Sequence, residues 1–211
     1  KMIKIFKYLS NCKFSYQLPK RNKVLLYDST MNSIRILNLL NITEFYKFNI
    51  RDEINIPILI FSILKNGFKN IFTNYKLAHI QFVNPKLVIT WTDNDINFYK
   101  LKEYLKNICF IAIQNGYRTG DNRDLFFRLE EENYSPKDLR TDLIICFGNA
   151  VAKEYKKHIN CSVLPLGSIR NNNINKVNFL KYNKELTYLS VFKTFAHKNS
   201  KVKKLNGKLY T

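Results

Sequence analysis

The chain has 211 residues, which is long enough for one substantial α/β domain or for one domain and part of a second. Hydrophobic residues make up 45% of the chain, which is ample for a packed core and excludes global disorder. The formal net charge of +19 would suit an anionic partner, but the lysines are scattered rather than clustered. The chain is also rich in Asn, Ile, Phe and Tyr, which together with lysine is the composition that AT-rich coding produces. The charge alone therefore identifies no partner.

Short β-rich runs alternate with helix-length patterns along the chain. In chain order we expect a strand at 23–27, a helix at 34–40, a strand at 43–49, helices at 55–72 and 75–83, a strand at 86–91, a helix at 97–106, a strand at 109–114, a long polar loop at 115–142, a strand at 143–147, a helix at 150–157 and a strand at 162–166. Continuously apolar strands that alternate with helices are buried on both faces. The sequence therefore predicts a Rossmann-like, doubly wound α/β domain with a mainly parallel sheet and helices on both faces.

The composition changes after Gly167, where the chain becomes polar and rich in asparagine. We predict an N-terminal extension at 1–22, the Rossmann-like domain at 23–167 and a linker at 168–185. The stretch 186–211 is expected to be the remnant of a second domain or a disordered basic tail. The chain is thus expected to be the N-terminal half of a two-domain protein, truncated in its second domain.

Several common functional motifs are absent from the chain. It contains no G-x-x-x-x-G-K-[ST], no G-x-G-x-x-G after the first strand, no H-E-x-x-H and no G-x-S-x-G, which argues against a P-loop enzyme, a nicotinamide dehydrogenase, a zincin and a serine hydrolase. The four cysteines lack C-x-x-C spacing, so we expect buried free thiols and no metal. The longest apolar run, 56–64, is far shorter than the ~20 residues of a membrane-spanning helix, so we expect a cytoplasmic protein that can touch a membrane surface.

Polar residues follow five of the predicted strands, at the edge where a parallel sheet presents its ligand crevice. In chain order they are Asp28, Asp93, Asn94, Gln114, Asn115, Gly116, Arg118, Gly148, Gly167, Ser168 and Arg170. Each type also has a structural explanation: Asp93 or Asp95 as a helix N-cap, the glycines as turn residues, and the arginines as solvated side chains.

Six blocks of the chain, taken together, resemble a family of bacterial surface-carbohydrate biosynthesis proteins. They are "KVLLYDST", "NIRDEINIPILIFSILKNG", "PKLVITWTDNDINFYKLKEYLKN", "FIAIQNGYRTGDNRDLF", "DLIICFGNAVAKEYKKHI" and "VLPLGSIRNN". The family occurs in O-antigen and capsule gene clusters and looks like glycosyltransferases of the GT-B type, with two Rossmann-like domains facing across a cleft. The resemblance implies that 23–167 forms the acceptor side of the cleft, and it adds Asn171 and Asn172 to the expected binding residues.

The resemblance also suggests roles for individual residues. Related GT-B polymer transferases often carry Gln-His-Gly where this chain has Gln114-Asn115-Gly116, and asparagine cannot act as a general base. Asp93 is therefore our candidate for the catalytic base, with Arg118 or Arg170 stabilising an anionic acceptor or a donor phosphate.

The leading hypothesis is the acceptor-side half of a glycosyltransferase-like enzyme of surface polysaccharide biosynthesis, inactive as this fragment. Its donor would be a nucleotide-activated sugar, and its acceptor would be a lipid-linked or growing glycan. We expect that it needs no metal and binds no nucleic acid. We also expect peripheral contact with the anionic face of the inner membrane. Two alternatives stay open: a polyol-phosphate or CDP-glycerol-type phosphotransferase on the same fold, and a non-enzymatic basic module that binds nucleic acid or anionic membrane.

Overall fold

The computed structural model describes residues 12–28, 33–34, 37–38, 40–49, 52–116, 118 and 124–169, together with two short strands at 203–205 and 208–210. The chain divides into two compact units, Lys1–Asn173 and Ile174–Thr211. The second unit contains an antiparallel pair, β9 (Lys203–Leu205) and β10 (Lys208–Tyr210). Most of the predicted linker and of the predicted second-domain remnant lies outside the described residues.

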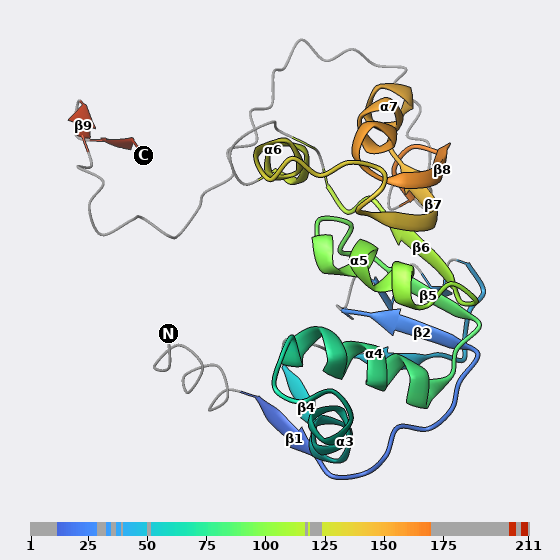
Figure 1. The fold of residues 1–211 in the computed structure, drawn as a ribbon. Helices are drawn as coiled ribbons and strands as arrows, with labels where there is room; N and C mark the ends of the chain where they lie inside the picture. Colours follow the sequence, from blue (N-terminus) through green and yellow to red (C-terminus); the bar gives the residue numbers. More distant parts are fainter. Residues whose placement is uncertain are drawn as a thin grey trace. The chain divides into compact units, whose positions relative to one another are not determined.

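Six parallel strands form the central sheet of the first unit. They are β2 (Val24–Tyr27), β3 (Tyr46–Phe48), β5 (Leu87–Thr90), β6 (Cys109–Ile113), β7 (Arg140–Cys146) and β8 (Asn160–Pro165). Their order across the sheet is β3-β2-β5-β6-β7-β8 (Figure 1). All six were expected from the sequence, and the predicted Rossmann-like α/β fold, a parallel sheet flanked by helices, is confirmed.

The helices are distributed over the sheet as right-handed crossovers require. They are α3 (Ile56–Asn66), α4 (Ile71–Val83), α5 (Ile96–Tyr104), α6 (Leu125–Glu131) and α7 (Asn149–His158). The chain steps from β2 to β3 in one direction, and from β5 onward it steps in the other direction. Because parallel crossovers are right-handed, Leu37, which lies between β2 and β3, packs on one face, and the helices that follow pack on the other. Figure 1 accordingly shows α4, α5 and α7 on one face of the sheet.

Two apolar clusters occupy the two faces of the sheet. On the first face, Phe110 and Ile144 of the strands pack against Phe98 of α5 and Tyr155 of α7, all fully buried. On the second face, side chains from the alternate strand positions pack against Leu37, Trp91 and Ile169. Strands whose successive side chains enter opposite clusters are apolar at every position, which explains their continuous hydrophobic runs.

Three local features differ from the sequence-based expectation. The helix expected at 55–72 ends at Asn66, because Gly67 adopts a φ of 67° and donates its backbone N–H to the Ile63 carbonyl. The expected N-terminal extension contains β1 (Lys13–Ser15), which pairs in parallel with β4 (Glu53–Asn55) outside the central sheet. The expected polar loop at 115–142 contains α6, whose Leu125 and Leu129 are buried one helical turn apart.

The four cysteines are free thiols, as predicted, but they are not all buried. Cys12 and Cys146 are buried, whereas Cys109 is exposed because it occupies the first position of β6. Within the described part of the chain, no helix is both long enough and apolar enough to cross a membrane.

Candidate active site at the carboxyl ends of the strands

The predicted site residues follow the parallel strands at one edge of the sheet, as expected. Asp28 comes directly after β2, Asp93 and Asn94 lie between β5 and α5, and the Gln114–Gly116 segment follows β6. The remaining described members are Arg118, Gly148, Gly167 and Ser168. Arg170, Asn171 and Asn172 lie outside the described residues.

Asp93 is the centre of a buried polar cluster that connects three elements of this edge. Its side chain is 0% exposed, and its Oδ1 atom accepts a hydrogen bond from the backbone N–H of Asn115 at 3.1 Å. The Oδ2 atom accepts from the Arg118 guanidinium and from the Tyr155 hydroxyl of α7. Both carboxylate oxygens are therefore engaged within the protein, and Asp93 joins the ends of β5 and β6 to α7.

Arg118 is the cation of this cluster. Its side chain is 9% exposed, and its Nη1 atom lies 3.7 Å from Oδ1 of Asp124, the N-cap residue of α6. Burial by itself would lower the pKa of the Arg118 guanidinium, but the adjacent Asp93 carboxylate and its hydrogen bond leave that pKa above its ordinary value. The Nε atom of Arg118 is buried and has no hydrogen-bond partner among the described residues. Among the described residues, Asp93 and Asp124 thus contact only the two terminal nitrogens of this guanidinium.

Two tyrosines complete the cluster, and sequence reasoning missed both. The Tyr99 hydroxyl of α5 donates to the backbone carbonyl of Asp93 at 2.6 Å, and Tyr155 donates to the Asp93 carboxylate. Burial, reinforced by the negative charge of Asp93, raises the pKa of both hydroxyls above the ordinary value, so both stay protonated and act as donors. Both lie in stretches expected to be helical, and no sequence signal marks where a buried hydroxyl will find its acceptor.

Gln114 connects the ends of two neighbouring strands. Its Oε1 atom accepts from the backbone N–H of Phe147 at 2.9 Å, and its Nε2 atom donates to the carbonyl of Gly116 at 2.8 Å. The side chain is almost completely buried. Gln114 therefore fixes the shape of the edge, while Asn115 contributes its backbone N–H to Asp93.

Asp95 acts as the N-cap of α5, as one reading of the sequence predicted. Its Oδ1 atom accepts from the backbone N–H of Asn97 at 3.1 Å, and its Oδ2 atom accepts from the Tyr27 hydroxyl at 3.1 Å. Asn94, half-buried beside it, lies in the turn before α5. The two neighbouring acids therefore have different roles, because Asp95 caps a helix while Asp93 pairs with a buried cation.

The glycines at this edge have open space around them. A Cβ atom added to Gly116 or Gly148 would have no atom of a described, non-adjacent residue within 4 Å. Gly148 occupies the N-cap position of α7 and, as a glycine, provides no side chain to cap the helix. Its backbone angles are extended, and any residue can adopt them. Backbone strain explains only Gly167, which has a φ of 81°. The first turn of α7 thus presents N–H groups without a capping side chain, which is a favourable arrangement for an anion.

A groove of about 420 Å³ lies between α6 and α7 and reaches this cluster. Arg118 and Asp124 line it together with Phe126 of α6 and with Ala150 and Val151 in the first turn of α7. The guanidinium and the uncapped helix start therefore face the same open space.

Fold and site together define the class of this protein. It is a Rossmann-like α/β domain with a buried Asp–Arg–Tyr cluster at the carboxyl ends of its parallel strands, beside an uncapped helix N-terminus. Ligands of open α/β sheets bind at this edge.

Comparison with known families connects this class to surface carbohydrates. Residues 111–211, just under half of the chain, match a family described as "putative O-antigen biosynthesis protein". The match begins in β6 and includes Arg118 and Tyr155. At a coarse level it supports a role in surface-carbohydrate biosynthesis. Searches of curated proteins and of solved structures found no match.

Proposed function

We propose that the Rossmann-like domain is the acceptor-side half of a glycosyltransferase-like enzyme of surface polysaccharide biosynthesis. The observation that carries the proposal is Arg118, which Asp93 holds at the strand-end edge beside the uncapped start of α7. The family match over 111–211 supports the biosynthetic context. A nucleotide-activated sugar would be the donor and would bind mainly to a partner domain of the GT-B arrangement.

The geometry favours an anionic group on the acceptor. A guanidinium that lines the groove and a helix start without a capping side chain both complement phosphate oxygens. Open space over Gly116 and Gly148 allows close approach to the backbone. A lipid-linked glycan acceptor, whose sugar is joined to the lipid through phosphate, fits these features.

Two roles are compatible with the position of Asp93. As the general base, it would accept the proton of the acceptor hydroxyl while the nucleoside phosphate leaves the donor. As a positioning residue, it would hold Arg118 and Tyr155 and would not touch the substrate. Its complete burial and its engaged oxygens favour the positioning role, and the general-base role stays a prediction.

The polyol-phosphate transferase alternative uses the same anion-binding features and differs in the group transferred. Screening nucleotide-activated sugars and nucleotide-activated polyols with an intact homologue separates these two enzymatic functions. The non-enzymatic alternative requires a basic surface on which several phosphates are neutralised at once. It predicts binding to DNA that falls tenfold or more over a roughly fourfold rise in salt.

The acceptor proposal makes a binding prediction for Arg118. We expect the full chain to bind a short-chain isoprenyl diphosphate-linked monosaccharide, and Arg118→Lys to weaken this binding by about tenfold, because lysine keeps the charge but loses the planar fork of donors. Isothermal titration calorimetry measures both affinities. Arg140→Met, which removes an exposed arginine at the first position of β7, is the matched control and should bind as the wild type does. Equal affinities for wild type and Arg118→Lys, or binding of DNA without binding of the acceptor, would contradict the proposal.

An exposed apolar surface supports contact with a membrane that carries such an acceptor. It consists of Ile60, Phe61 and Leu64 of α3, Phe68 in the connection and Phe72 of α4, which we name the α3–α4 surface. Leu64 is 82% exposed and Phe68 is 78% exposed. Lys65 and Lys69 lie on the same segment, and exposed aromatic and aliphatic side chains interleaved with lysines suit the interface of an anionic bilayer.

Vesicle binding tests the α3–α4 surface. We expect the chain to co-float with vesicles that contain phosphatidylglycerol, and a Leu64→Gln, Phe68→Ser double variant to partition about tenfold less, because two exposed apolar side chains no longer enter the bilayer interface. Tyr104→Ser removes an exposed aromatic residue at the end of α5 and should leave partitioning unchanged. Equal partitioning of the double variant and the wild type would remove this surface from the proposal.

A further inference from the structure

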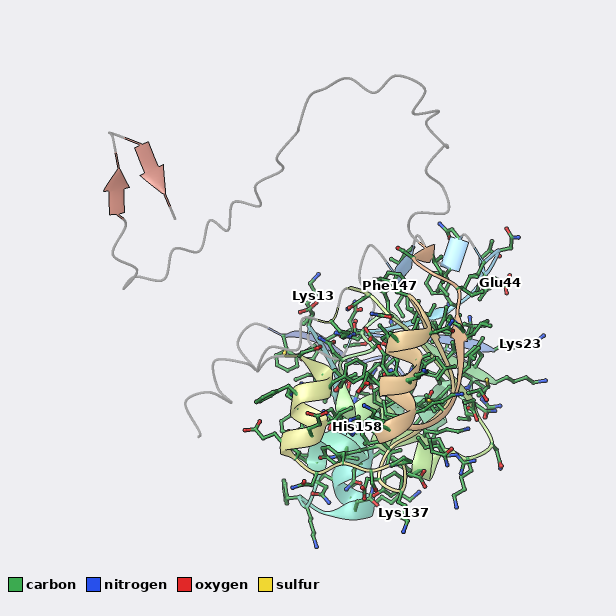
Figure 2. All side chains as sticks on the ribbon, turned by 90° about the horizontal axis from the view of Figure 1, so that it is seen from above. Lys13, Lys23, Glu44, Lys137, Phe147 and His158 are labelled. Carbon is green, nitrogen blue, oxygen red and sulfur yellow. The ribbon has the colours of Figure 1, made fainter. Side chains whose placement is uncertain are left out.

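Three potential metal ligands come together between α6 and α7, where Figure 2 labels His158, and two of them line the groove that also contains Arg118. Glu130 is contributed by α6, and Glu154 and His158 are contributed by α7. One ligand atom from each of the three lies within 4.8 Å of the other two. We propose that Glu130, Glu154 and His158 form a binding site for a divalent transition-metal ion, with Zn²⁺ as the best-suited ion.

The helical positions explain why these side chains meet. Glu154 and His158 are four residues apart on α7, so they lie on the same face one turn from each other. Glu130 reaches them from the last turn of α6, and its Oε1 atom is 4.0 Å from Nε2 of His158. Ligand atoms bound to one ion are about 3–4 Å apart when each lies about 2 Å from it, so small side-chain rotations would close the site.

The orientation of His158 is the observation that points to a ligand. Its Nδ1 atom lies 3.2 Å from the backbone carbonyl of Tyr134, and because a carbonyl only accepts, Nδ1 must carry the hydrogen. In a neutral imidazole the Nε2 atom then holds a lone pair. Only 8% of His158 is exposed, and its Nε2 atom is buried without a hydrogen-bond partner among the described residues. This buried nitrogen lies within 4.8 Å of carboxylate oxygens of Glu130 and Glu154, and a cation bound between the three atoms would satisfy it.

The contact between His158 and the Tyr134 carbonyl resembles the hydrogen bond that orients a histidine ligand in many metal sites. A metal-bound histidine usually donates its other N–H to a carbonyl or carboxylate, which fixes the ring and makes the coordinating nitrogen more basic. The contact between His158 and Tyr134 has this form. His158 is therefore already oriented as a ligand in the structure.

The donor set selects the type of ion. One imidazole nitrogen and two carboxylates suit Zn²⁺ and similar transition metals better than Mg²⁺ or Ca²⁺, which prefer oxygen ligands alone. Lys157 pairs with Glu154 at 2.7 Å, but this lysine side chain is 60% exposed. An exposed pair of this kind is weak, so a bound ion would displace the ammonium group easily.

The position of the site gives the ion a structural and an electrostatic effect. It would join α6 to α7, and it would replace the negative charge of two carboxylates on the groove wall with a bound cation. Three protein ligands leave a coordination position open toward the groove, as in catalytic zinc sites. The cysteine spacing in the sequence led us to expect no metal, and the proposed site departs from that expectation because it contains no cysteine.

Zinc titration of the full chain tests the proposal. We expect one Zn²⁺ per chain by isothermal titration calorimetry, together with a rise in Tm when Zn²⁺ is added. Glu154→Gln and His158→Asn should each weaken Zn²⁺ binding by about a hundredfold, because each removes one of three ligands. Glu131→Gln, which changes the exposed neighbour of Glu130, is the matched control and should bind Zn²⁺ as the wild type does.

The outcomes separate this site from other zinc-binding groups. Glu154→Gln changes a surface carboxylate and leaves all cysteines in place, so it keeps the test decisive even if His158→Asn does not fold. Loss of the bound Zn²⁺ in Glu154→Gln with retention in Glu131→Gln supports the site. Unchanged affinity in Glu154→Gln, or no Zn²⁺ binding by the wild type, overturns it, and neither result depends on acceptor binding at Arg118.

Discussion

Asp93→Asn is expected to lower the free energy of unfolding by about 3–5 kcal/mol, because the buried Arg118 guanidinium loses its closer counter-charge and keeps only the more distant contact with Asp124 at 3.7 Å. The Tyr155 hydroxyl would also lose its charged acceptor. Urea unfolding followed by circular dichroism measures this change. Asp95→Asn is the matched control on the neighbouring acid, and it should cost less than about 1 kcal/mol because asparagine is also a good N-cap.

A double-mutant cycle shows whether the cost comes from the pairing with Arg118. Arg118→Met removes the cation, and we expect Asp93→Asn to cost at least about 2 kcal/mol less in that background than in the wild type. If the two substitutions were additive, Asp93 would stabilise the domain through other contacts. A stable Asp93→Asn chain would contradict the positioning role, and if the same change abolished transfer in an intact homologue, it would favour the general-base role.

The sequence predicted the strand-end edge well because its signal is strong and local. Each strand is a continuous apolar run, and Asp93, Gln114 and Gly148 follow those runs directly. Parallel pairing then places these residues at one edge whatever the details of packing. The N-cap role of Asp95 was recognisable for the same reason, since capping depends on residues within one helical turn.

Sequence reasoning missed parts of the site for two physical reasons: some contacts join residues distant in the chain, and one helix is too short to give a clear pattern. Asp93 and Tyr155 are 62 positions apart, and only the completed sheet brings the hydroxyl of α7 to the end of β5. The short helix α6 lies in an acidic, polar stretch, where two buried leucines provide too short a pattern to indicate a helix. The cluster of Glu130, Glu154 and His158 was missed in the same way, because one of its members lies on that unexpected helix.

The buried cluster around Asp93 and the groups that line the groove have different roles in the candidate site. Asp93, Tyr155 and Gln114 are buried and bonded within the protein, so they fix the framework. Arg118 and the start of α7, which has no capping side chain, line the groove, and they are the groups that a ligand there would meet. A substitution in the framework should therefore change stability first, and a substitution at the open edge should change binding first.

Gly148→Asp is expected to change stability and binding in opposite directions. Gly148 has extended backbone angles, and an added Cβ atom would meet no atom of a described, non-adjacent residue within 4 Å, so we expect aspartate to be accommodated there without backbone strain. It would cap α7 and complement the helix dipole, which should raise the free energy of unfolding by about 0.5–1.5 kcal/mol. Its carboxylate would also occupy the anion-binding N–H groups and repel an acceptor phosphate, so we expect the affinity for the isoprenyl diphosphate-linked monosaccharide to fall by tenfold or more.

Gly148→Ser separates charge from capping in this experiment. Serine caps the helix as aspartate does but carries no charge, so it should stabilise the domain slightly and weaken acceptor binding less than aspartate does. Urea unfolding and calorimetric titration of the three chains provide both quantities. If Gly148→Asp bound the acceptor as tightly as the wild type, the start of α7 would not be the anion site, and Arg118 would have to bind the acceptor without it. If Gly148→Asp and Gly148→Ser weakened acceptor binding equally, the acceptor would require the open space over Gly148 and not the dipole of α7.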